Sequence, residues 1–102
     1  MVTGDGGKLR AAFARIGGSA VELLEPLDGD SYHAKALLRN GPGFHHNAYI
    51  CEDNFDKTVS EFLAMGGRIV WEMRHGDEHA CYIESADGKT VVELINCCPF
   101  MP

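Results

Sequence analysis

The chain has 102 residues, 45% of them apolar, and a formal net charge of −6. This length suits one small domain, and the apolar fraction excludes an intrinsically disordered protein. The acidic balance, with a pI near 5.2, argues against a nucleic-acid-binding surface. No apolar run approaches the roughly 20 residues of a membrane span, and MVTGDGGKLR lacks the apolar stretch of a signal peptide. We therefore expect a cytoplasmic protein with neither nucleic-acid nor membrane partners.

The four cysteines, at positions 51, 81, 97 and 98, form no CxxC pair. Their spacing fits no common structural zinc pattern. Adjacent cysteines such as Cys97 and Cys98 rarely bridge, because the linkage is strained. We expect reduced, partly buried thiols, as is usual in a cytoplasmic protein.

The first predicted elements are two strands. Residues 1–7 are Gly-rich and predicted to be flexible. The runs LRAAFARI (9–16) and AVELLEP (20–26) then flank Gly17 and Gly18. Two apolar runs joined by a Gly-rich turn are typical of a β-hairpin.

A helix is predicted next, over residues 28–41. Asp30 or Ser31 can accept hydrogen bonds from the free N–H groups of its first turn, and Gly41 ends it. Its apolar face is expected to carry Ala34, Leu37 and Leu38.

The second half of the chain predicts a strand, a helix and three further strands. The strand is HHNAYICE (45–52), and the helix covers 52–67 with Asp53 as its N-cap. The apolar stripe of this helix consists of Phe55, Val59, Phe62 and Leu63. The last three strands are RIVWEM (68–73), HACYIES (79–85) and TVVELIN (90–96), with ADGK (86–89) as a hairpin turn. The order predicts an α+β fold, a βαβββ module preceded by a hairpin and a short helix, in a single domain over residues 8–98.

Three strands each place one metal-capable side chain among apolar neighbours. Because neighbours in a strand point to opposite faces, Glu22 shares a face with Leu24, His46 with Ile50, and Glu93 with Ile95. An ionised carboxylate in such a place is costly unless it is paired or binds a cation. Two carboxylates and an imidazole suit Mn, Fe, Co, Ni or Zn. The alternative is that one or both glutamates lie at a solvated edge of the sheet.

The remaining histidines are expected to have no ligand role. His33, His75 and His79 are predicted to be solvent-exposed. The same alternation makes His45 face away from His46, so that His45 is expected to be structural and to fix the loop before the strand.

A longer pattern of motifs points to a family. The run FARIGGSAVELLEPLDGDSYHAKALLRNGPGFHHNAY contains a Gly turn, an ELLEPL strand, a DS-x-x-AK-x-L helix and G-x-G-x-HH-x-AY, in that order. An acidic-capped helix ending in Gly-Gly-Arg and a terminal VEL strand follow. Over residues 9–96 the chain resembles the vicinal oxygen chelate superfamily, the glyoxalase and bleomycin-resistance fold, and within it methylmalonyl-CoA epimerase.

The resemblance implies a mixed, curved sheet with helices on its outer face and a metal site in a cup. It makes Glu22, His46 and Glu93 the metal ligands, and Glu93 also the catalytic base. The implied activity is that of an isomerase or lyase which removes a proton next to a carbonyl and stabilises the enolate with a divalent ion (Co, Ni, Zn, Mn or Fe).

The family cup is built from two βαβββ modules, and the first βα unit has no counterpart in this chain. We expect a truncated cup that a second copy completes in a homodimer, because exposed sheet edges are poorly tolerated in a monomer.

An alternative is a non-catalytic protein that sequesters a small molecule in the same cup, and a third option is an accessory domain with no retained site. The aromatic side chains expected to line a substrate or ligand site are Trp71, Phe13 and Tyr82.

Overall fold

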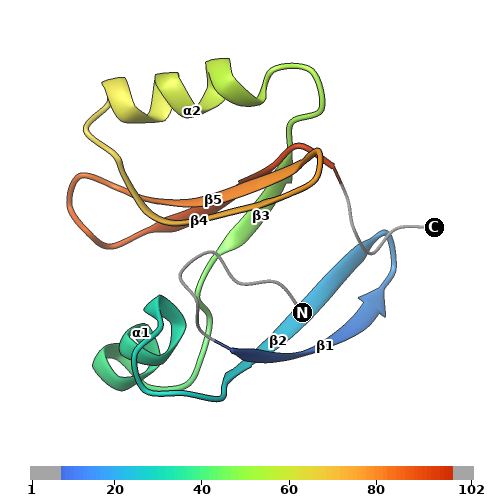
Figure 1. The fold of residues 1–102 in the computed structure, drawn as a ribbon, viewed down its shortest axis with the longest axis vertical. Helices are drawn as coiled ribbons and strands as arrows, with labels where there is room; N and C mark the ends of the chain where they lie inside the picture. The colour runs from blue at the N-terminus through green and yellow to red at the C-terminus, as the bar shows by residue number, and fades with distance from the viewer. Residues whose placement is uncertain (1–7, 98–102) are drawn as a thin grey trace. The chain divides into compact units, whose positions relative to one another are not determined.

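The computed structural model describes residues 8–97. The chain divides into two compact units, residues 1–42 and residues 43–102, which we call the N-terminal and the C-terminal unit. The N-terminal unit contains β1 (Leu9–Ile16), β2 (Ser19–Pro26) and α1 (Tyr32–Asn40) (Figure 1). The C-terminal unit contains β3 (Asn47–Ile50), α2 (Phe55–Ala64), β4 (Arg68–His75), β5 (Glu78–Glu84) and β6 (Val91–Ile95).

The predicted first hairpin is confirmed. Strands β1 and β2 pair antiparallel without interruption, from Leu9 opposite Pro26 to Ile16 opposite Ser19. Gly17 in the turn has φ 60°, a left-handed conformation that glycine adopts without steric cost. The sequence therefore folds into a tight two-stranded ribbon.

Helix α1 follows β2 and is anchored at its start. The Ser31 hydroxyl, one of the two predicted caps, accepts a hydrogen bond from the Ala34 N–H at 3.1 Å. The Asp28 carboxylate accepts hydrogen bonds from the backbone N–H groups of Lys8 at 2.7 Å and Ser31 at 3.2 Å. These bonds, that of Lys8 first, lower the pKa of Asp28.

The predicted apolar face of α1 is wrong. Its buried residues are His33 and Ala36, whereas Leu37 is exposed and Leu38 is 89% exposed. The periodicity of three apolar residues fits two neighbouring helix faces almost equally well, because positions three and four apart lie side by side.

The C-terminal unit is a βαβββ module around one mixed sheet. The strand order is β3-β6-β5-β4, with β3 parallel to β6 and the other neighbours antiparallel. Helix α2 lies over one face of this sheet (Figure 1). The predicted α+β fold, with its hairpin and short helix before the module, is thus confirmed.

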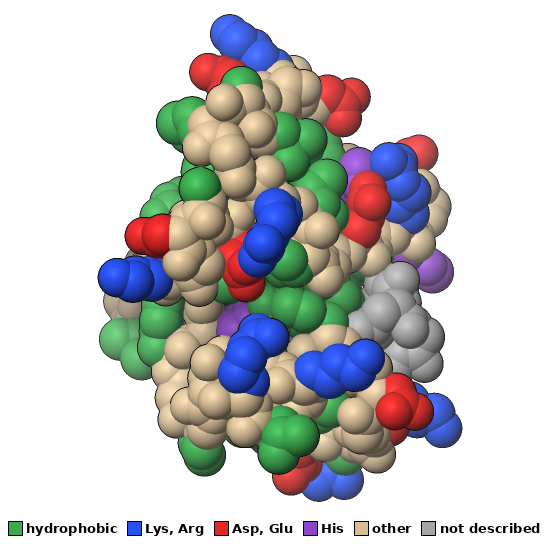
Figure 2. All heavy atoms as spheres, turned by 90° about the vertical axis from the view of Figure 1, so that its left-hand side faces the viewer, with side chains coloured by type: hydrophobic (Ala, Val, Ile, Leu, Met, Phe, Trp, Pro, Cys, Tyr) green, Lys and Arg blue, Asp and Glu red, His purple; other side chains and the backbone are tan. Residues whose placement is uncertain are grey.

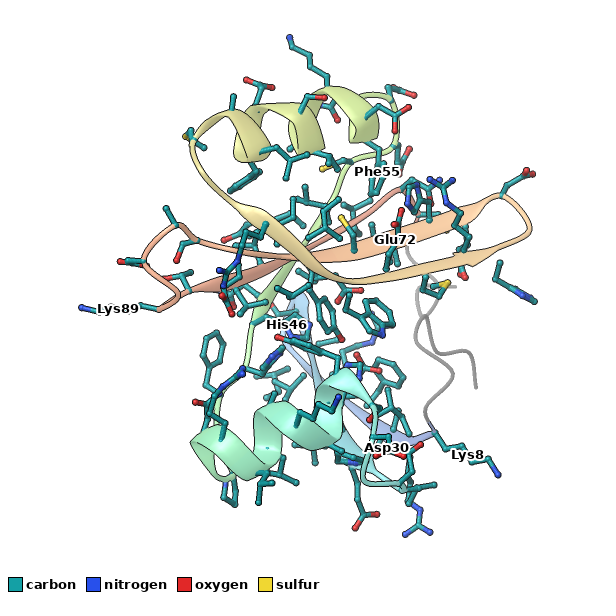
Figure 3. All side chains as sticks on the ribbon, turned by 60° about the vertical axis from the view of Figure 1, so that its left-hand side comes forward. Lys8, Asp30, His46, Phe55, Glu72 and Lys89 are labelled. Carbon is teal, nitrogen blue, oxygen red and sulfur yellow. The ribbon has the colours of Figure 1, made fainter. Side chains whose placement is uncertain are left out.

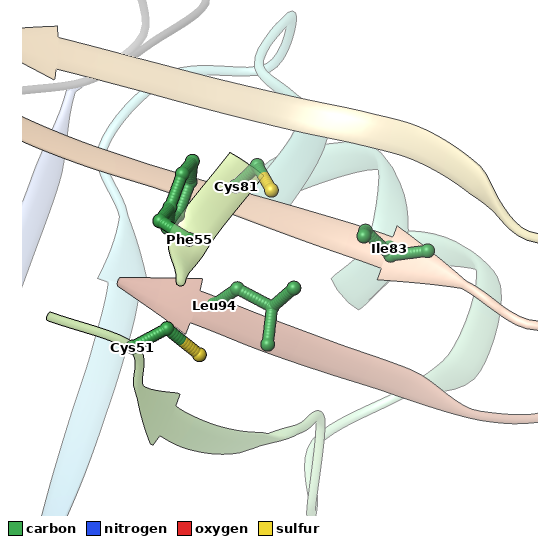
Figure 4. Packing of buried hydrophobic residues seen from close by; sticks show 5 residues of the cluster. All are labelled: Cys51, Phe55, Cys81, Ile83 and Leu94. Carbon is green, nitrogen blue, oxygen red and sulfur yellow. The ribbon is translucent and has the colours of Figure 1, made fainter. Parts of the chain in front are cut away.

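The core of the C-terminal unit lies on the α2 side of the sheet; Figure 4 shows five of its residues. It consists of Cys51, Phe55, Cys81, Ile83 and Leu94, with Val59, Phe62 and Val92 packed against it. Three of the four predicted stripe residues of α2 face this core, whereas Leu63 is exposed. The N-cap is Asn54 and not Asp53, and its side chain makes no capping hydrogen bond.

A glycine sets how closely the end of α2 approaches β5. A Cβ atom at Gly67 would lie 2.8 Å from Ile83 Cγ2 and 2.9 Å from the carbonyl oxygen of Phe62. Both distances are shorter than carbon and oxygen atoms tolerate, so a side chain at this position would push the helix away from the core.

The surface mixes charged and apolar side chains. Figure 2 shows acidic and basic groups interspersed over one face, with hydrophobic side chains reaching the surface between them. Neither of the two described helices has the length and apolarity that a membrane span requires.

Candidate functional site

The face of the C-terminal sheet opposite α2, which we call the inner face, carries the polar residues of interest. Cys81, Ile83 and Leu94 point to α2, so their neighbours Tyr82 and Glu93 point to the inner face. Tyr82 and Glu93 lie directly opposite each other in the β5–β6 pair. Figure 3 shows His46 on this side of the sheet and Phe55 on the helix side.

The inner face brings together two of the predicted metal ligands. His46 Nε2 lies 3.0 Å from Glu93 Oε1, and their side chains are only 10% and 15% exposed. His46 directly precedes β3, whose second residue, Ala48, pairs with Glu93 in the parallel β3–β6 ladder. The parallel pairing of β3 with β6, which are connected through α2, β4 and β5, therefore places residues 47 positions apart in sequence within hydrogen-bonding distance.

Two aromatic rings support this pair. The Tyr82 ring lies 4.4 Å from the His46 ring, and Trp71 stacks on Tyr82 at 4.3 Å with an interplanar angle of 27°. Both Trp71 and Tyr82 are buried. The rings consequently restrict how far the imidazole of His46 can turn away from Glu93.

The expectation that His45 faces away from His46 is wrong. The Nδ1 atoms of the two imidazoles lie 2.6 Å apart, and the His45 ring is 5.4 Å from that of Tyr82. Strand β3 begins at Asn47, so both histidines precede it and strand alternation does not apply to them. One Nδ1 donates and the other accepts, which links the tautomers of the two rings.

Glu22 and Phe13 belong to the N-terminal unit. They lie directly opposite each other in the β1–β2 pair, on one face of the ribbon, and both are exposed. The structure thus brings the predicted residues together in two groups: Phe13 with Glu22, and His46, Glu93, Tyr82 and Trp71 on the inner face.

The chemistry of the His46–Glu93 pair fits a divalent ion. An imidazole nitrogen and a carboxylate oxygen are borderline donors that suit late first-row metals. His46 Nε2 and Glu93 Oε1 lie 3.0 Å apart, a hydrogen-bonding distance. Two ligand atoms about 2.1 Å from one tetrahedral ion lie about 3.4 Å apart, so a small displacement of the side chains would let both bind it. Within residues 43–97, no third His, Cys, Asp or Glu side chain joins them in a group that could hold an ion.

The sequence analysis missed a second histidine–carboxylate pair. His79 was expected to be solvent-exposed, but its side chain is largely buried, with Nε2 2.5 Å from Glu72 Oε2 and its ring 4.4 Å from that of Phe55. His79 borders a hollow of about 500 Å³ near the start of α2. A tight turn at Gly76 joins β4 to β5 and sets the strand register, in which Arg74 lies opposite His79. The Gly-Asp pair between two apolar runs is the sequence signal for this turn.

The other two histidines differ from each other. His33 is buried, against expectation, whereas His75 is exposed as predicted. His33 lies on the face of α1 that the periodicity assigned to solvent.

The described cysteines are at positions 51, 81 and 97. Cys51 and Cys81 are buried and form no disulfide, and Cys97 is partly buried, while Cys98 lies outside the described residues. Burial, followed by the negative charges of Glu72 and Glu93, raises the pKa of Cys81 to about 11. The thiol of Cys81 therefore stays protonated at neutral pH and is a poor nucleophile.

Residues 4–84 match the family model described as the glyoxalase/bleomycin resistance protein/dioxygenase superfamily. The chain belongs to this superfamily. The match includes both strands of the first hairpin, β3, α2, β4 and β5, and ends before β6, which carries Glu93. Superfamily membership thus rests on residues other than those of the last strand.

Two individual proteins are similar to this superfamily member. A hypothetical protein from Bacillus halodurans of known crystal structure superposes with a TM-score of 0.67 and 24% identity, over 92% of this chain and 70% of that one. It shares the fold. The uncharacterized protein YqjC of Bacillus subtilis (strain 168) is 41% identical over 44 residues, which is 43% of this chain and 31% of that relative. The matched part is therefore less than a third of the length of this curated relative.

Proposed function

We propose that this chain is a metal-dependent isomerase or lyase of the glyoxalase or methylmalonyl-CoA epimerase type. The observation that carries the proposal is the buried His46–Glu93 contact at 3.0 Å on the inner face. Burial of an imidazole and a carboxylate side by side is costly for a purely structural purpose, and sites of this kind concentrate in functional regions.

Three residues would hold the ion: Glu22, His46 and Glu93. His46 and Glu93 supply two donors, and Glu22 is the third, on the hairpin whose VEL run repeats that of β6. When bound, the ion would supply Lewis-acid stabilisation of the negative charge that develops on a substrate oxygen.

Glu93 would be the catalytic base. Its carboxylate takes the proton from the carbon next to the substrate carbonyl, and the electron pair of the broken C–H bond moves onto the carbonyl oxygen to form an enolate. Protonation of the same carbon by water on the opposite face, with the first proton lost from Glu93 to solvent, gives epimerisation. Delivery of the proton from Glu93 to the neighbouring carbon gives a glyoxalase-type isomerisation. Trp71, Tyr82 and Phe13 would line the substrate site, which would accept a thioester or a 2-oxo compound.

The second candidate is a protein that binds a small molecule without turnover. The stacked Trp71–Tyr82 rings next to His46 favour it, because aromatic surfaces are common in sites that hold apolar ligands.

We further propose a homodimer. Exposed apolar side chains of the β1–β2 hairpin, among them Ile16, Val21 and Leu23, support it, because such surface is poorly tolerated in a monomer.

Solvent exchange of the substrate proton separates enzyme from binder. An acyl-CoA thioester and a 2-oxo thiol adduct are incubated in D₂O with the protein, each divalent ion in turn, and NMR detection of deuterium at the carbon next to the carbonyl. Deuterium uptake that stops with a chelator and in Glu93→Gln, but continues in the control Glu25→Gln, is the result expected of the enzyme. Ligand-induced stabilisation that survives the chelator, without any exchange, would identify the binder instead.

A further inference from the structure

One face of the β1–β2 ribbon is apolar and uncovered. We call it the Leu23 face; it consists of Arg10, Ala12, Ala14 and Ile16 from β1, and of Ser19, Val21, Leu23 and Glu25 from β2. All eight residues are exposed. The buried or partly buried residues of the ribbon, Leu9, Leu24 and Pro26, all lie on the opposite face, together with Glu22.

The C-terminal hairpin indicates that such a face belongs in an interface. The runs Val21-Glu22-Leu23 and Val92-Glu93-Leu94 correspond, and each glutamate has an aromatic partner across its hairpin. Leu94 is 1% exposed beneath α2, whereas Leu23 in the corresponding position is 64% exposed. A contiguous apolar face of this kind on a soluble protein marks a contact surface.

The Leu23 face has a shape that complements itself. On β1 its middle residues are small, Ala12 and Ala14, and on β2 they are larger, Leu23 and Val21. In the register of the hairpin, Ala12 lies beside Leu23 and Ala14 beside Val21. The face therefore has a raised row along one strand and a shallow row along the other.

A two-fold axis parallel to the strands, between two facing ribbons, matches these rows. Rotation about this axis exchanges the β1 side with the β2 side and leaves the position along the strands unchanged. Leu23 then lies over the partner's Ala12, and Val21 over the partner's Ala14. Aligned sheets pack face to face in this way, about 10 Å apart.

Charge is complementary in the same arrangement. Arg10 and Glu25 form an exposed ion pair across the hairpin, with Arg10 Nη1 3.1 Å from Glu25 Oε1. Under the same two-fold axis, Arg10 also faces the partner's Glu25, and Glu25 faces the partner's Arg10. Each guanidinium can thus bridge two carboxylates at one end of the interface, where like charges would otherwise repel.

We propose that the Leu23 face is the contact surface of a homodimer, occupied by the same face of a second copy of this chain. The inference assigns a contact surface to the homodimer that is part of the proposed function. It rests on the proposed function only for the statement that the chain dimerises. It leaves the face of β1–β2 that carries Glu22 and Phe13 uncovered by the dimer contact.

Sedimentation equilibrium over a concentration series tests the proposal. We expect the wild-type protein to dimerise, and Leu23→Asp to weaken the dimer by about 30-fold or more, since it places a charge at the centre of the interface. Leu38→Asp is the matched control, because Leu38 is 89% exposed on α1 and lies outside the Leu23 face; it should dimerise like the wild type.

A charge exchange provides a second test with little risk to folding. Arg10→Glu alone and Glu25→Arg alone should each weaken the dimer, because each places like charges opposite each other across the interface, and the double variant should restore it. A wild-type protein that stays monomeric overturns the proposal. This includes a monomer whose Leu23 face binds a helical peptide, as the corresponding face of the C-terminal sheet binds α2. So does a dimer that survives Leu23→Asp and both single charge changes. Metal content, measured on the same samples, reports on the proposed function independently.

Discussion

The two hairpins of this protein share a sequence pattern but differ in burial. Both contain a Val-Glu-Leu run with an aromatic residue opposite the glutamate. In β5–β6 the leucine lies in the core, whereas in β1–β2 its counterpart is 64% exposed. Strand alternation determines which residues share one face of a hairpin. Whether those residues are buried, and so stabilise the fold, depends on whether another element such as α2 packs on that face.

The glutamates of the two hairpins differ in a parallel way. Glu93 has an imidazole at 3.0 Å and little exposure, whereas Glu22 is exposed beside Phe13 on its own ribbon. A buried carboxylate interacts with a cation more strongly than one in contact with water, because its surroundings have a lower effective dielectric constant. In the proposed metal site, Glu93 is therefore expected to contribute more to the affinity for the ion than Glu22.

The largest expected difference between the hairpins is in the free energy of unfolding. Leu94→Ala should lower it by about 3 kcal/mol, because the cavity opens under α2, whereas Leu23→Ala should change it by less than about 1 kcal/mol. Urea denaturation followed by circular dichroism, at a protein concentration low enough to keep the chain monomeric, measures both. Equal losses would mean that the Leu23 face is buried in the folded monomer.

The next largest difference is expected between the metal affinities of the two glutamate variants. Glu93→Gln is expected to weaken binding of a divalent ion by about 100-fold, and Glu22→Gln by about 10-fold, since the charge of the largely buried Glu93 is less screened by water than that of the exposed Glu22. Isothermal titration with Zn²⁺ and Co²⁺ measures both constants. Glu25→Gln, on the Leu23 face, is the control; a loss of affinity there as large as in the other two would contradict the assignment.

The close approach of α2 to β5 gives a third contrast. Gly67→Ala should destabilise the protein by about 1–3 kcal/mol, because the added Cβ would meet Ile83 Cγ2 and the Phe62 carbonyl. Gly18→Ala, in the turn of β1–β2, has open space around it and no positive φ, and it should be nearly neutral. Thermal unfolding of both variants would reveal a wrong placement of α2 if Gly67→Ala were equally neutral.

The smallest effect concerns pH. Burial raises the pKa of Cys81 to about 11 in the folded protein, from 9.0. Because the folded state holds this proton more tightly, the contribution of Cys81 to stability is present below pH 9 and is lost as the pH rises toward 11. The loss between pH 8 and pH 10 should be on the order of 1 kcal/mol. Cys81→Ala should abolish that part of the pH dependence in urea titrations. Alanine is the residue at position 12, which lies opposite Leu23 as Cys81 lies opposite Leu94.

Most of the fold could be predicted from the sequence, because its strands and helices are strongly patterned. The β1–β2 hairpin and the βαβββ order follow from Gly-containing turns between apolar runs, and three residues of the α2 stripe face the core as expected. The exposed face of α1 could not be predicted reliably, since three apolar residues do not fix the direction of a short helix.

The site was predictable only in part. Parity and resemblance singled out His46 and Glu93, and the structure brings them together. The role of His45 was missed because it depends on where β3 begins, and strand ends are the least predictable feature of a sequence. The His79–Glu72 pair was missed because it depends on a register between two strands, which alternation alone does not give.

Metal content tests the central claim most directly. The wild-type protein, His46→Ala and the control His75→Ala, which alters an exposed histidine, are loaded with divalent ions, dialysed and measured by elemental analysis. We predict about one ion per chain in the wild type and in His75→Ala, and little or none in His46→Ala. A wild-type protein that retains no ion, or a His46→Ala variant that retains as much as the wild type, would contradict the account.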